Sequence, residues 1–295
     1  MNELHDVTVF EKKRPYLLGL AYRILGSLAD AEDAVQDTFL KWRGADRTTI
    51  RDPSAWLTTA CTRRCIDILS ARHTRVDYVG AWLPEPIHAV TEATPESDLE
   101  LASSLSTAFL LLLERLTPKE RAAYLLHEIF SRPYPEIAAA LGMQEAACRK
   151  LVSRARTSVG EDRMRHVASR ERQEELLAAF RSAVATGVTE PLAALLSDDI
   201  ALTADGGGKV TTIERALSGK PEVLPFVAER LRNWWSSYEW QLVRINGALG
   251  ALLLENGQIV AALSFAFDAE GRATGIFIMR NPDKLARLSA EVFLS

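Results

Sequence analysis

Basic side chains at helical spacing near the middle of the chain are the residues that most clearly indicate a chemistry. Four of them would share one face of a helix, where cations bind phosphates: Arg149, Lys150, Arg154 and Arg156. The helix that carries them would follow a shorter helix across a glycine, which is the anatomy of a helix-turn-helix. The stretch from Tyr134 to Arg156 therefore predicts a recognition helix for the major groove of DNA. The alternative is a helical hairpin with a solvated basic face.

The two helices of this motif have recognisable limits. The first would begin at Pro135, whose missing N–H is not needed in a first helical turn. Gly142 would let the chain leave that helix with a positive φ, and the second helix would cover residues 144–156. Spacings of three and four predict which residues face inward: Ile137, Ala138, Leu141, Ala147, Leu151 and Ala155.

Composition limits how such a motif could act. The chain has 295 residues, enough for two or three compact units, and its hydrophobic content of 47% is typical of a globular protein. A net charge of -4 argues against a uniform positive field around the molecule, so any contact with DNA must be local. Three cysteines without clustered histidines predict reduced, buried thiols and no metal site.

The N-terminal sequence has no apolar core after a basic start, and no apolar run approaches the length of a membrane span. We therefore expect a cytoplasmic protein without a membrane partner.

Packed helices are expected from Val7 to Arg75, and two of them carry opposite charges on their outer faces. The helix after Gly26 would be capped by Ser27 or Asp30. Its outer face is acidic and polar, with Asp30, Glu32, Asp33, Gln36 and Asp37. A third helix from Pro53 shows cations: Arg63, Arg64 and Arg72. The asymmetry favours two different macromolecular surfaces, with ordinary mixing of surface charge as the alternative.

A proline-rich linker interrupts the helices between Val76 and Ser103. Trp82 and Leu83 stand beside its prolines, so this part could dock in a groove or cover nearby core. Helices then resume, and Thr117 and Glu120 form a capping box at the start of a helix over 118–129.

The last part of the chain has a different pattern. A helix over 173–186 and a short segment at 191–196 precede five alternating runs, which predict strands at 200–204, 240–245, 248–254, 258–266 and 275–279. Asn256-Gly257 is a hairpin signal, and Asn281-Pro282 would cap a last helix. Helices followed by strands indicate an α+β domain.

These residues resemble a known family, the bacterial sigma factors of the extracytoplasmic-function group. The run DAEDAVQDTFLKW at 30–42 is similar to the helix with which the family binds core RNA polymerase. The runs LTPKERAAYLLHEIF, YPEIAAALG and ACRKLVSRAR resemble its promoter-reading region four. Three further motifs resemble a subgroup with a fused SnoaL-like C-terminal domain: WLPEP at 82–86, DGGGK at 205–209 and NPDKL at 281–285.

The resemblance implies two all-α helical domains followed by an α+β cone around a cavity. Sigma region two would cover residues 1–76 and a linker 77–103. Region four would cover 104–167, and the SnoaL-like domain 168–295.

The resemblance also implies partners for the charged faces. Core RNA polymerase, through its largest subunits, would meet Asp30, Asp33, Gln36 and Asp37. The minus-ten element of promoter DNA would meet the loop 44–51 with Arg63, Arg64 and Arg72. The minus-thirty-five element would meet the start of the recognition helix and its cations: Gln144, Glu145, Ala147, Cys148, Arg149, Lys150 and Arg154. Arg149 is the best candidate for a guanine contact. Many relatives carry Asn where this chain has Arg63, so their promoter sequence does not carry over.

In the family the C-terminal domain regulates the sigma regions in cis. A regulatory interface is therefore expected to contain Trp82, Leu83, Pro84, Asp205, Lys209, Asn281, Pro282 and Asp283. Residues 170–295 contain no histidine and no evident pair of catalytic carboxylates, so we expect neither an enzyme nor a cofactor. Trp234, Trp235, Tyr238 and Trp240 could line a small-molecule cavity, although a core cluster is favoured. Two alternatives are a ligand-sensing helix-turn-helix regulator that acts without core polymerase and a DNA-tethered enzyme.

Overall fold

The computed structural model describes residues 2–71, 80–87, 104–160 and 168–288, and it divides into two compact units. Unit 1 comprises Met1–Val76 with Leu112–Asp162, and unit 2 comprises Asp77–Leu111 with Arg163–Ser295. The linker thus belongs to the same unit as the C-terminal domain. Among the described residues, no helix combines the length and apolarity needed to cross a bilayer.

Unit 1 begins with three long helices, α1 (Asn2–Leu25), α2 (Leu28–Gly44) and α3 (Pro53–Ala71), with a short turn η1 (Arg47–Thr49) before α3. The hydroxyl of Ser27 accepts a hydrogen bond from the N–H of Asp30, so Ser27 is the cap of α2. The core between these helices is made of fully buried side chains, among them Leu17, Leu20, Ile24, Trp42, Leu57 and Cys61. Burial raises the pKa of the Cys65 thiol well above its usual value.

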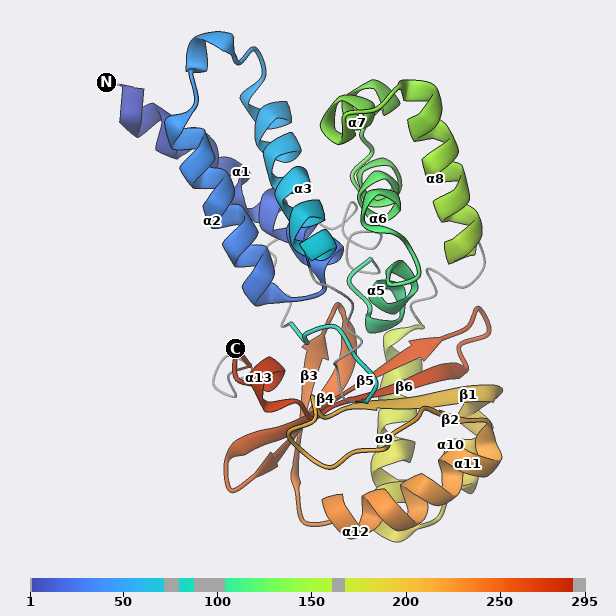
Figure 1. Cartoon of the computed structure of the whole chain (residues 1–295). Coiled ribbons are helices and arrows are strands. Elements are labelled where there is room, and N and C mark those ends of the chain that lie inside the picture. Colours follow the sequence, from blue (N-terminus) through green and yellow to red (C-terminus); the bar gives the residue numbers. More distant parts are fainter. Residues whose placement is uncertain (1, 72–79, 88–103, 161–167, 289–295) are drawn as a thin grey trace. The chain divides into compact units, whose positions relative to one another are not determined.

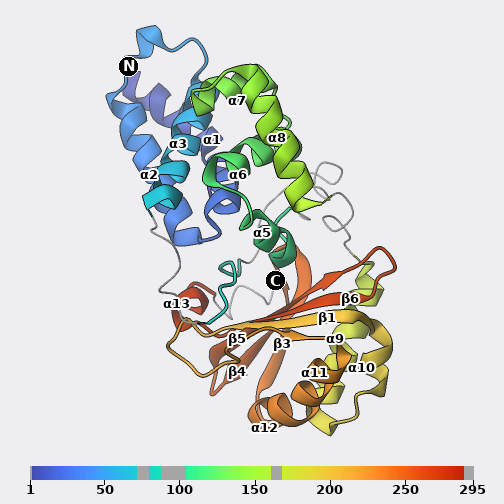
Figure 2. The same ribbon diagram turned by 45° about the vertical axis from the view of Figure 1, so that its right-hand side comes forward.

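The second half of unit 1 contains α6 (Pro118–Tyr124), a π-helical turn η3 (Leu125–Ile129), α7 (Tyr134–Leu141) and α8 (Glu145–Val159). The predicted capping box is present, since Thr117 and Glu120 bond each other's backbone N–H. Gly142 has a φ of 64° and ends α7, as the sequence predicted. Figures 1 and 2 show α7 and α8 as a short helix followed by a longer one across a tight turn.

Unit 2 is an α+β domain, which confirms the expected fold class (Figure 1). Its helical elements are α9 (Arg170–Thr186), α10 (Glu190–Leu195), α11 (Lys220–Pro225), η4 (Phe226–Leu231), α12 (Arg232–Trp235) and α13 (Pro282–Leu285). Its strands are β1 (Leu196–Asp205), β2 (Leu217–Ser218), β3 (Glu239–Ile245), β4 (Ala248–Glu255), β5 (Gln258–Phe267) and β6 (Ala273–Met279). Helix α5 (Thr107–Leu113) crosses from unit 2 into unit 1.

The strands form one sheet in the order β2-β1-β6-β5-β4-β3. Strands β3 to β6 are an antiparallel meander, whereas β1 lies parallel to β6. All five predicted strands are present, and the hairpin at Asn256-Gly257 joins β4 to β5. The sequence did not predict β2 or the helical stretch Lys220–Trp235, because neither has a clean apolar period.

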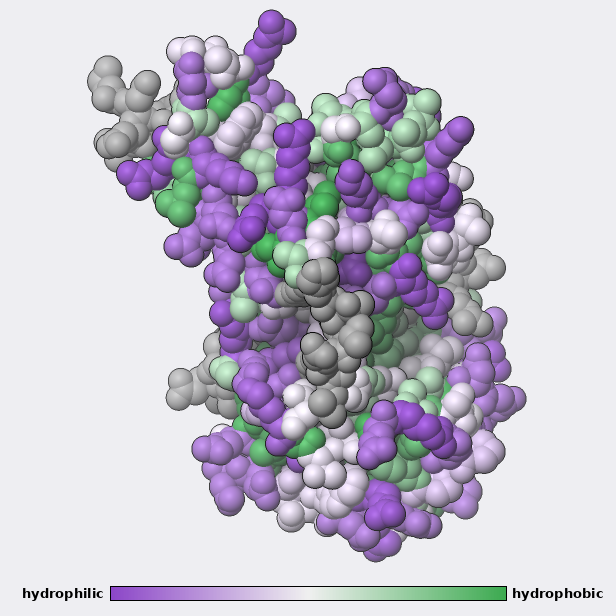
Figure 3. Space-filling view, viewed as in Figure 1, coloured by the Kyte–Doolittle hydropathy of each residue, from purple (hydrophilic) through white to green (hydrophobic). Residues whose placement is uncertain are grey.

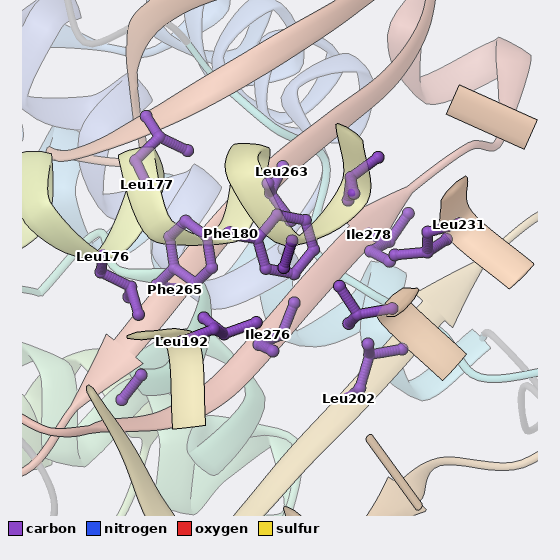
Figure 4. Packing of buried hydrophobic residues seen from close by; sticks show 14 of the residues in the cluster. Leu176, Leu177, Phe180, Leu192, Leu202, Leu231, Leu263, Phe265, Ile276 and Ile278 are labelled. Atoms are coloured by element: carbon purple, nitrogen blue, oxygen red, sulfur yellow. The ribbon is translucent and has the colours of Figure 1, made fainter. Parts of the chain in front are cut away.

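Each face of this sheet has its own apolar core. One core lies under α9 and the other helices, where Leu176, Leu177 and Phe180 meet side chains of the sheet (Figure 4). The other core holds Leu83 from the linker and Leu285 from α13 against side chains such as Val243, Leu252 and Phe277. The linker segment is therefore part of the folded C-terminal domain.

Candidate nucleic-acid interface and linker site

The predicted acidic face of α2 is present. Its opposite side is buried through Ala31, Ala34, Val35, Thr38 and Trp42. Asp33 and Gln36 are exposed, Asp37 is half-buried, and Asp30 lies in the first turn beside the Ser27 cap. The sequence interpretation missed Leu40, which is 55% exposed one turn beyond Gln36. An apolar side chain at that spacing would extend a polar docking stripe with a hydrophobic contact.

The cations of α3 do not act as one patch. The Nε of Arg63 donates to the carbonyl of Ala140 at 2.7 Å, and its Nη2 donates to Ala139 at 2.9 Å. The next residue, Arg64, instead pairs with Asp37 at 2.6 Å. Neighbouring residues on a helix point about 100° apart, so the two guanidinium groups meet different elements. Arg72 lies outside the described residues.

The loop between α2 and α3 is held by its own side chains. The carboxylate of Asp46 accepts hydrogen bonds from the N–H of Thr48 at 3.0 Å and from its hydroxyl at 2.7 Å. These bonds stabilise the charged form, so the pKa of Asp46 lies below its ordinary value. This ordering gives the predicted minus-ten loop a defined shape.

The recognition helix α8 is present, with one correction to its inward face. Ala147 is exposed and Cys148 is fully buried, so the expectation for Ala147 as an inward residue and for Cys148 as a DNA contact was wrong. The buried face of α8 is defined by residues that recur every three or four positions up to the end of the helix: Cys148, Leu151, Val152, Ala155 and Val159. Read from this longer run, the start of α8 exposes Gln144, Ala147, Arg149 and Lys150.

The arginines of α8 are each paired with a glutamate of unit 1. Arg149 bonds Glu145 and lies over the ring of Tyr134, 4.4 Å from its centroid. Arg154 lies 3.3 Å from Glu120, and Arg156 lies 2.6 Å from Glu128. In Figure 3 the surface over α8 mixes hydrophilic side chains with apolar ones. Both side chains of the Arg149–Glu145 pair are more than a third exposed, so that pair contributes little. Glu120 and Glu128 are mostly buried, while their arginines are exposed.

The WLPEP motif of the linker and the DGGGK and NPDKL motifs of the C-terminal domain meet at one site of unit 2. Asp205, at the end of β1, is fully buried, and its Oδ2 lies 2.6 Å from the Nζ of Lys284 in α13. The same oxygen accepts the N–H of Leu83 at 2.8 Å, and Lys284 also donates to the Leu83 carbonyl at 2.6 Å. We call these three residues the linker clamp. The backbone of Leu83 thus gives each member of the buried ion pair a further hydrogen bond, which helps to offset the cost of burying the two charges.

Residues around the linker clamp fix its geometry. The Nζ of Lys284 lies 4.6 Å from the centroid of the Trp82 ring, a cation–π contact. Asn281 caps α13 by accepting the N–H of Asp283, as predicted. Gly207 has a φ of 62°, and a Cβ at this position would collide with Asn281. The DGGGK turn thus needs glycine for the close approach of the NPDKL segment.

Several residues predicted for the regulatory interface lie at or beside the clamp, and two further residues of this site were missed; the regulatory role itself stays a prediction. Lys209 pairs with Asp283 at the surface, and Pro84 is buried. Lys284 was missed, although it belongs to the NPDKL motif, because a lysine in a last turn usually faces solvent. Asn246 was also missed; its side chain accepts the N–H of Ile87 and its N–H donates to the Ile87 carbonyl.

The aromatic residues of the cone form a core cluster. Trp235 is buried, and its ring centroid lies 6.1 Å from that of Trp240. The ring centroid of Trp240 lies 6.2 Å from that of Phe180. Tyr238 is half-buried beside this core, and Trp234 is 39% exposed. The favoured interpretation of these residues is therefore confirmed for Trp235 and Trp240, while a small-molecule ligand of the cone stays a prediction.

Comparisons with known proteins cover both units. Residues 9–75 match the family described as Sigma-70 region 2, and residues 106–159 match Sigma-70, region 4. The ECF RNA polymerase sigma factor SigJ of Mycobacterium tuberculosis is 36% identical, over 95% of this chain and 93% of that protein. The probable ECF RNA polymerase sigma factor SigI of the same species is 30% identical, over 95% and 94%.

The likeness extends to structure. The crystal structure of the Mycobacterium tuberculosis extracytoplasmic function sigma factor SigJ is similar with a TM-score of 0.73 and 33% identity, covering 95% of this chain and 98% of the other. The shared sequence runs through both helical regions and the C-terminal sheet, so the chain belongs to the extracytoplasmic-function RNA polymerase sigma factors.

Proposed function

We propose that this sigma factor binds core RNA polymerase through the exposed stripe of α2 and directs it to promoters. The observation that carries the proposal is the stripe itself, in which Asp33, Gln36 and Leu40 are exposed at spacings of three and four. A basic surface of the largest polymerase subunit would complement the two carboxylates Asp33 and Asp37. The partner places the protein in the cytoplasm. A regulator that acts without polymerase would have no need of such a stripe.

Promoter contacts would divide between the two halves of unit 1. The start of α8, with Gln144, Glu145 and Arg149, would read the minus-thirty-five element, and Lys150 and Arg154 would bind phosphates. The loop before α3, together with Arg63, Arg64 and Arg72, would meet the minus-ten element. We assign region two to residues 1–76, the linker to 77–103, region four to 104–167 and the C-terminal domain to 168–295.

The C-terminal domain would regulate the sigma regions and would have no catalytic role. Its distinctive motifs are used to hold the linker: Asp205 and Lys284 bond the backbone of Leu83 in a buried site. The linker joins the two sigma regions along the chain. Holding or releasing it therefore changes the length of free chain between them, and hence how they can engage two promoter elements together.

Binding to purified core polymerase tests the first proposal. The full chain should bind at submicromolar affinity, and a variant with Asp33→Lys and Asp37→Lys should lose binding at least tenfold, since two favourable contacts become repulsive. Glu171→Lys with Glu175→Lys is a matched control, because both residues are exposed one turn apart on α9. Equal loss in the control, or none in the test variant, would contradict the proposal.

Trp82→Ala tests the regulatory proposal in transcription by the holoenzyme. Removal of the ring from Lys284 should change transcript yield while circular dichroism shows a folded chain. Trp234→Ala removes an exposed indole from α12 and should leave the yield unchanged. Unchanged yield with Trp82→Ala would exclude a regulatory role for the contact between Trp82 and Lys284.

A further inference from the structure

One arginine of the recognition helix is held from two directions. The Nε of Arg149 donates to the Oε1 of Glu145 at 3.1 Å, and its Nη2 donates to the same oxygen. The central carbon of its guanidinium group lies 4.4 Å from the centroid of the Tyr134 ring. Glu145 begins α8 and Tyr134 begins α7, so elements on both sides of the turn at Gly142 hold this one cation.

A histidine supports the ring of Tyr134. The ring centroids of His127 and Tyr134 are 4.2 Å apart, with 30° between the ring planes. Two planar groups this close to one centroid would collide on a single face of the ring, so the imidazole covers one face and the guanidinium of Arg149 the other. We call His127, Tyr134 and Arg149 the arginine stack. Contact with the face of an aromatic ring stabilises a cation.

The segment before α7 fixes the orientation of the histidine. His127 belongs to the π-helical turn η3, a kind of turn that is frequent at functional sites. Its Nδ1 donates to the carbonyl of Arg132 at 3.2 Å, since a carbonyl oxygen can only accept. In the loop that this bond closes, Ser131 has a φ of 48°, which is uncommon for a residue other than glycine. The imidazole is therefore held by the backbone on the side away from α8.

The guanidinium of Arg149 is placed where it can meet a base. Its side chain is 59% exposed, and the bonds to Glu145, one turn earlier, draw it toward the start of α8. This is the part of a recognition helix that contacts base edges. The bonds to Glu145 use Nε and one hydrogen of Nη2, so Nη1 and the other hydrogen of Nη2 can donate together to O6 and N7 of a guanine.

We propose that Tyr134, backed by His127, and Glu145 are positioning residues that hold Arg149 ready to read one base pair of the minus-thirty-five element. The inference rests on the proposed function, in which the start of α8 contacts this element; within that contact, Tyr134 and Glu145 act through Arg149. A loose arginine at this exposed position could turn to a neighbouring phosphate, where it would add affinity for every sequence alike. An arginine ordered in advance loses less side-chain entropy when it meets its base.

Holoenzyme selection from a promoter library tests the positioning role. Arg149→Ala identifies the base pair that Arg149 reads. Tyr134→Ala should relax preference at the same base pair about three- to tenfold, because the freed arginine has to be ordered on binding. Tyr134→Phe keeps both faces of the ring and should keep the preference. The dependence of binding on salt should be the same in both tyrosine variants, because neither removes a phosphate contact.

Double variants separate positioning from a structural effect. Tyr134→Ala combined with Arg149→Ala should show the base preference of Arg149→Ala alone, because the tyrosine acts only through that arginine. Arg154→Ala is the matched control, since this exposed arginine of the same helix pairs with Glu120; its effect should add to that of Tyr134→Ala. Equal weakening of all sequences by Tyr134→Ala would mean that the ring only stabilises the helix-turn-helix, and would overturn the proposal.

A measurement without DNA distinguishes failure of this inference from failure of the proposed function. NMR relaxation of the Arg149 Nε–H group in the intact free chain should show an ordered side chain, which becomes mobile in Tyr134→Ala and stays ordered in Tyr134→Phe. If Arg149→Ala relaxes no base pair, the proposed base contact fails, and the reading role of the arginine stack fails with it. If Arg149→Ala relaxes one base pair but Tyr134→Ala leaves both that preference and the order of Arg149 unchanged, the positioning inference alone fails.

Discussion

The Nε of Arg64 lies 2.6 Å from the Oδ2 of Asp37, and both side chains are more than a third exposed. Arg64 is proposed to bind promoter DNA and Asp37 to bind polymerase, so the free chain pairs two groups that each need another partner in the transcribing complex. Polymerase that takes the carboxylate would release the guanidinium for a phosphate. If those proposed roles hold, the pair would link polymerase binding to DNA binding within region two.

The pair predicts an effect of opposite sign on the two binding steps. Arg64→Ala should tighten binding of core polymerase by about 1.5- to 5-fold, because an exposed ion pair worth about 0.2–1 kcal/mol no longer has to be broken. The same variant should weaken promoter binding by the holoenzyme. Titration of labelled chain with core, followed by promoter titration, measures both. Arg181→Ala on α9 removes the same charge far along the chain and should do neither; weaker core binding by Arg64→Ala would contradict the link.

Arg149 and Arg156 should differ in the information that they read. Arg149→Ala removes a side chain near the start of α8 and should relax preference at one base pair of the minus-thirty-five element, at a cost of about 1–3 kcal/mol for the preferred base. Arg156→Ala should weaken all sequences alike, because a residue at the end of the helix would reach only phosphates. Holoenzyme selection from a promoter library separates the two. Equal relaxation by both variants would contradict this assignment.

Much of the fold follows from local sequence rules. Proline at first turns, the Thr117 capping box, Gly142 and the Asn256-Gly257 hairpin each depend on a few neighbouring residues, and each is present in the structure. The parallel pairing of β1 with β6 joins residues about 75 positions apart, as with Ala201 and Gly275. Nothing in either strand alone specifies such a partner, so topology could not be predicted from the pattern.

The sites show the same limit. Charge along α2 and α8 marks these helices as candidate binding surfaces, but contacts across the fold decide which partner each cation has. Arg63 and Arg64 are adjacent residues of the same type, and only the tertiary structure shows that one bonds α7 and the other Asp37. Lys284 is likewise committed to a buried carboxylate 79 positions away.

Acid should loosen the start of α6 through Glu120. Burial alone would raise the pKa of this carboxyl, but hydrogen bonds from Thr117 and the charge of Arg154 hold it below its ordinary value of 4.5. A lowered folded-state pKa contributes stability that is present above about pH 4.5 and is lost as pH falls through the folded-state value. Melting temperatures of the chain and of Glu120→Gln should therefore converge between pH 6 and pH 3. A gap that stays constant would mean that the carboxylate charge contributes nothing. Glu11→Gln, which removes an exposed carboxylate from α1, should show little gap throughout.

Two lysine–aspartate pairs of the same motifs should differ sharply in their effect on the linker. Lys284→Met leaves the carboxylate of Asp205 buried and without its ammonium partner, which costs about 3–5 kcal/mol when one member of a buried pair is removed. Lys209→Met breaks the exposed pair with Asp283 and should cost about 0–1 kcal/mol.

Hydrogen exchange of the backbone amides of residues 82–87 compares the effect of the two variants on the linker, since Leu83 bonds both members of the buried pair. Lys284→Met should expose the linker amides, and Lys209→Met should leave them protected. Combining Lys284→Met with Asp205→Asn removes the isolated charge and should restore part of the stability but not the bond from Lys284 to the Leu83 carbonyl. The double variant would then keep a folded sheet with a mobile linker, which isolates the effect of linker release on transcription. If the linker stays protected in Lys284→Met, apolar packing of Leu83 alone holds it, and the ion pair cannot be the switch.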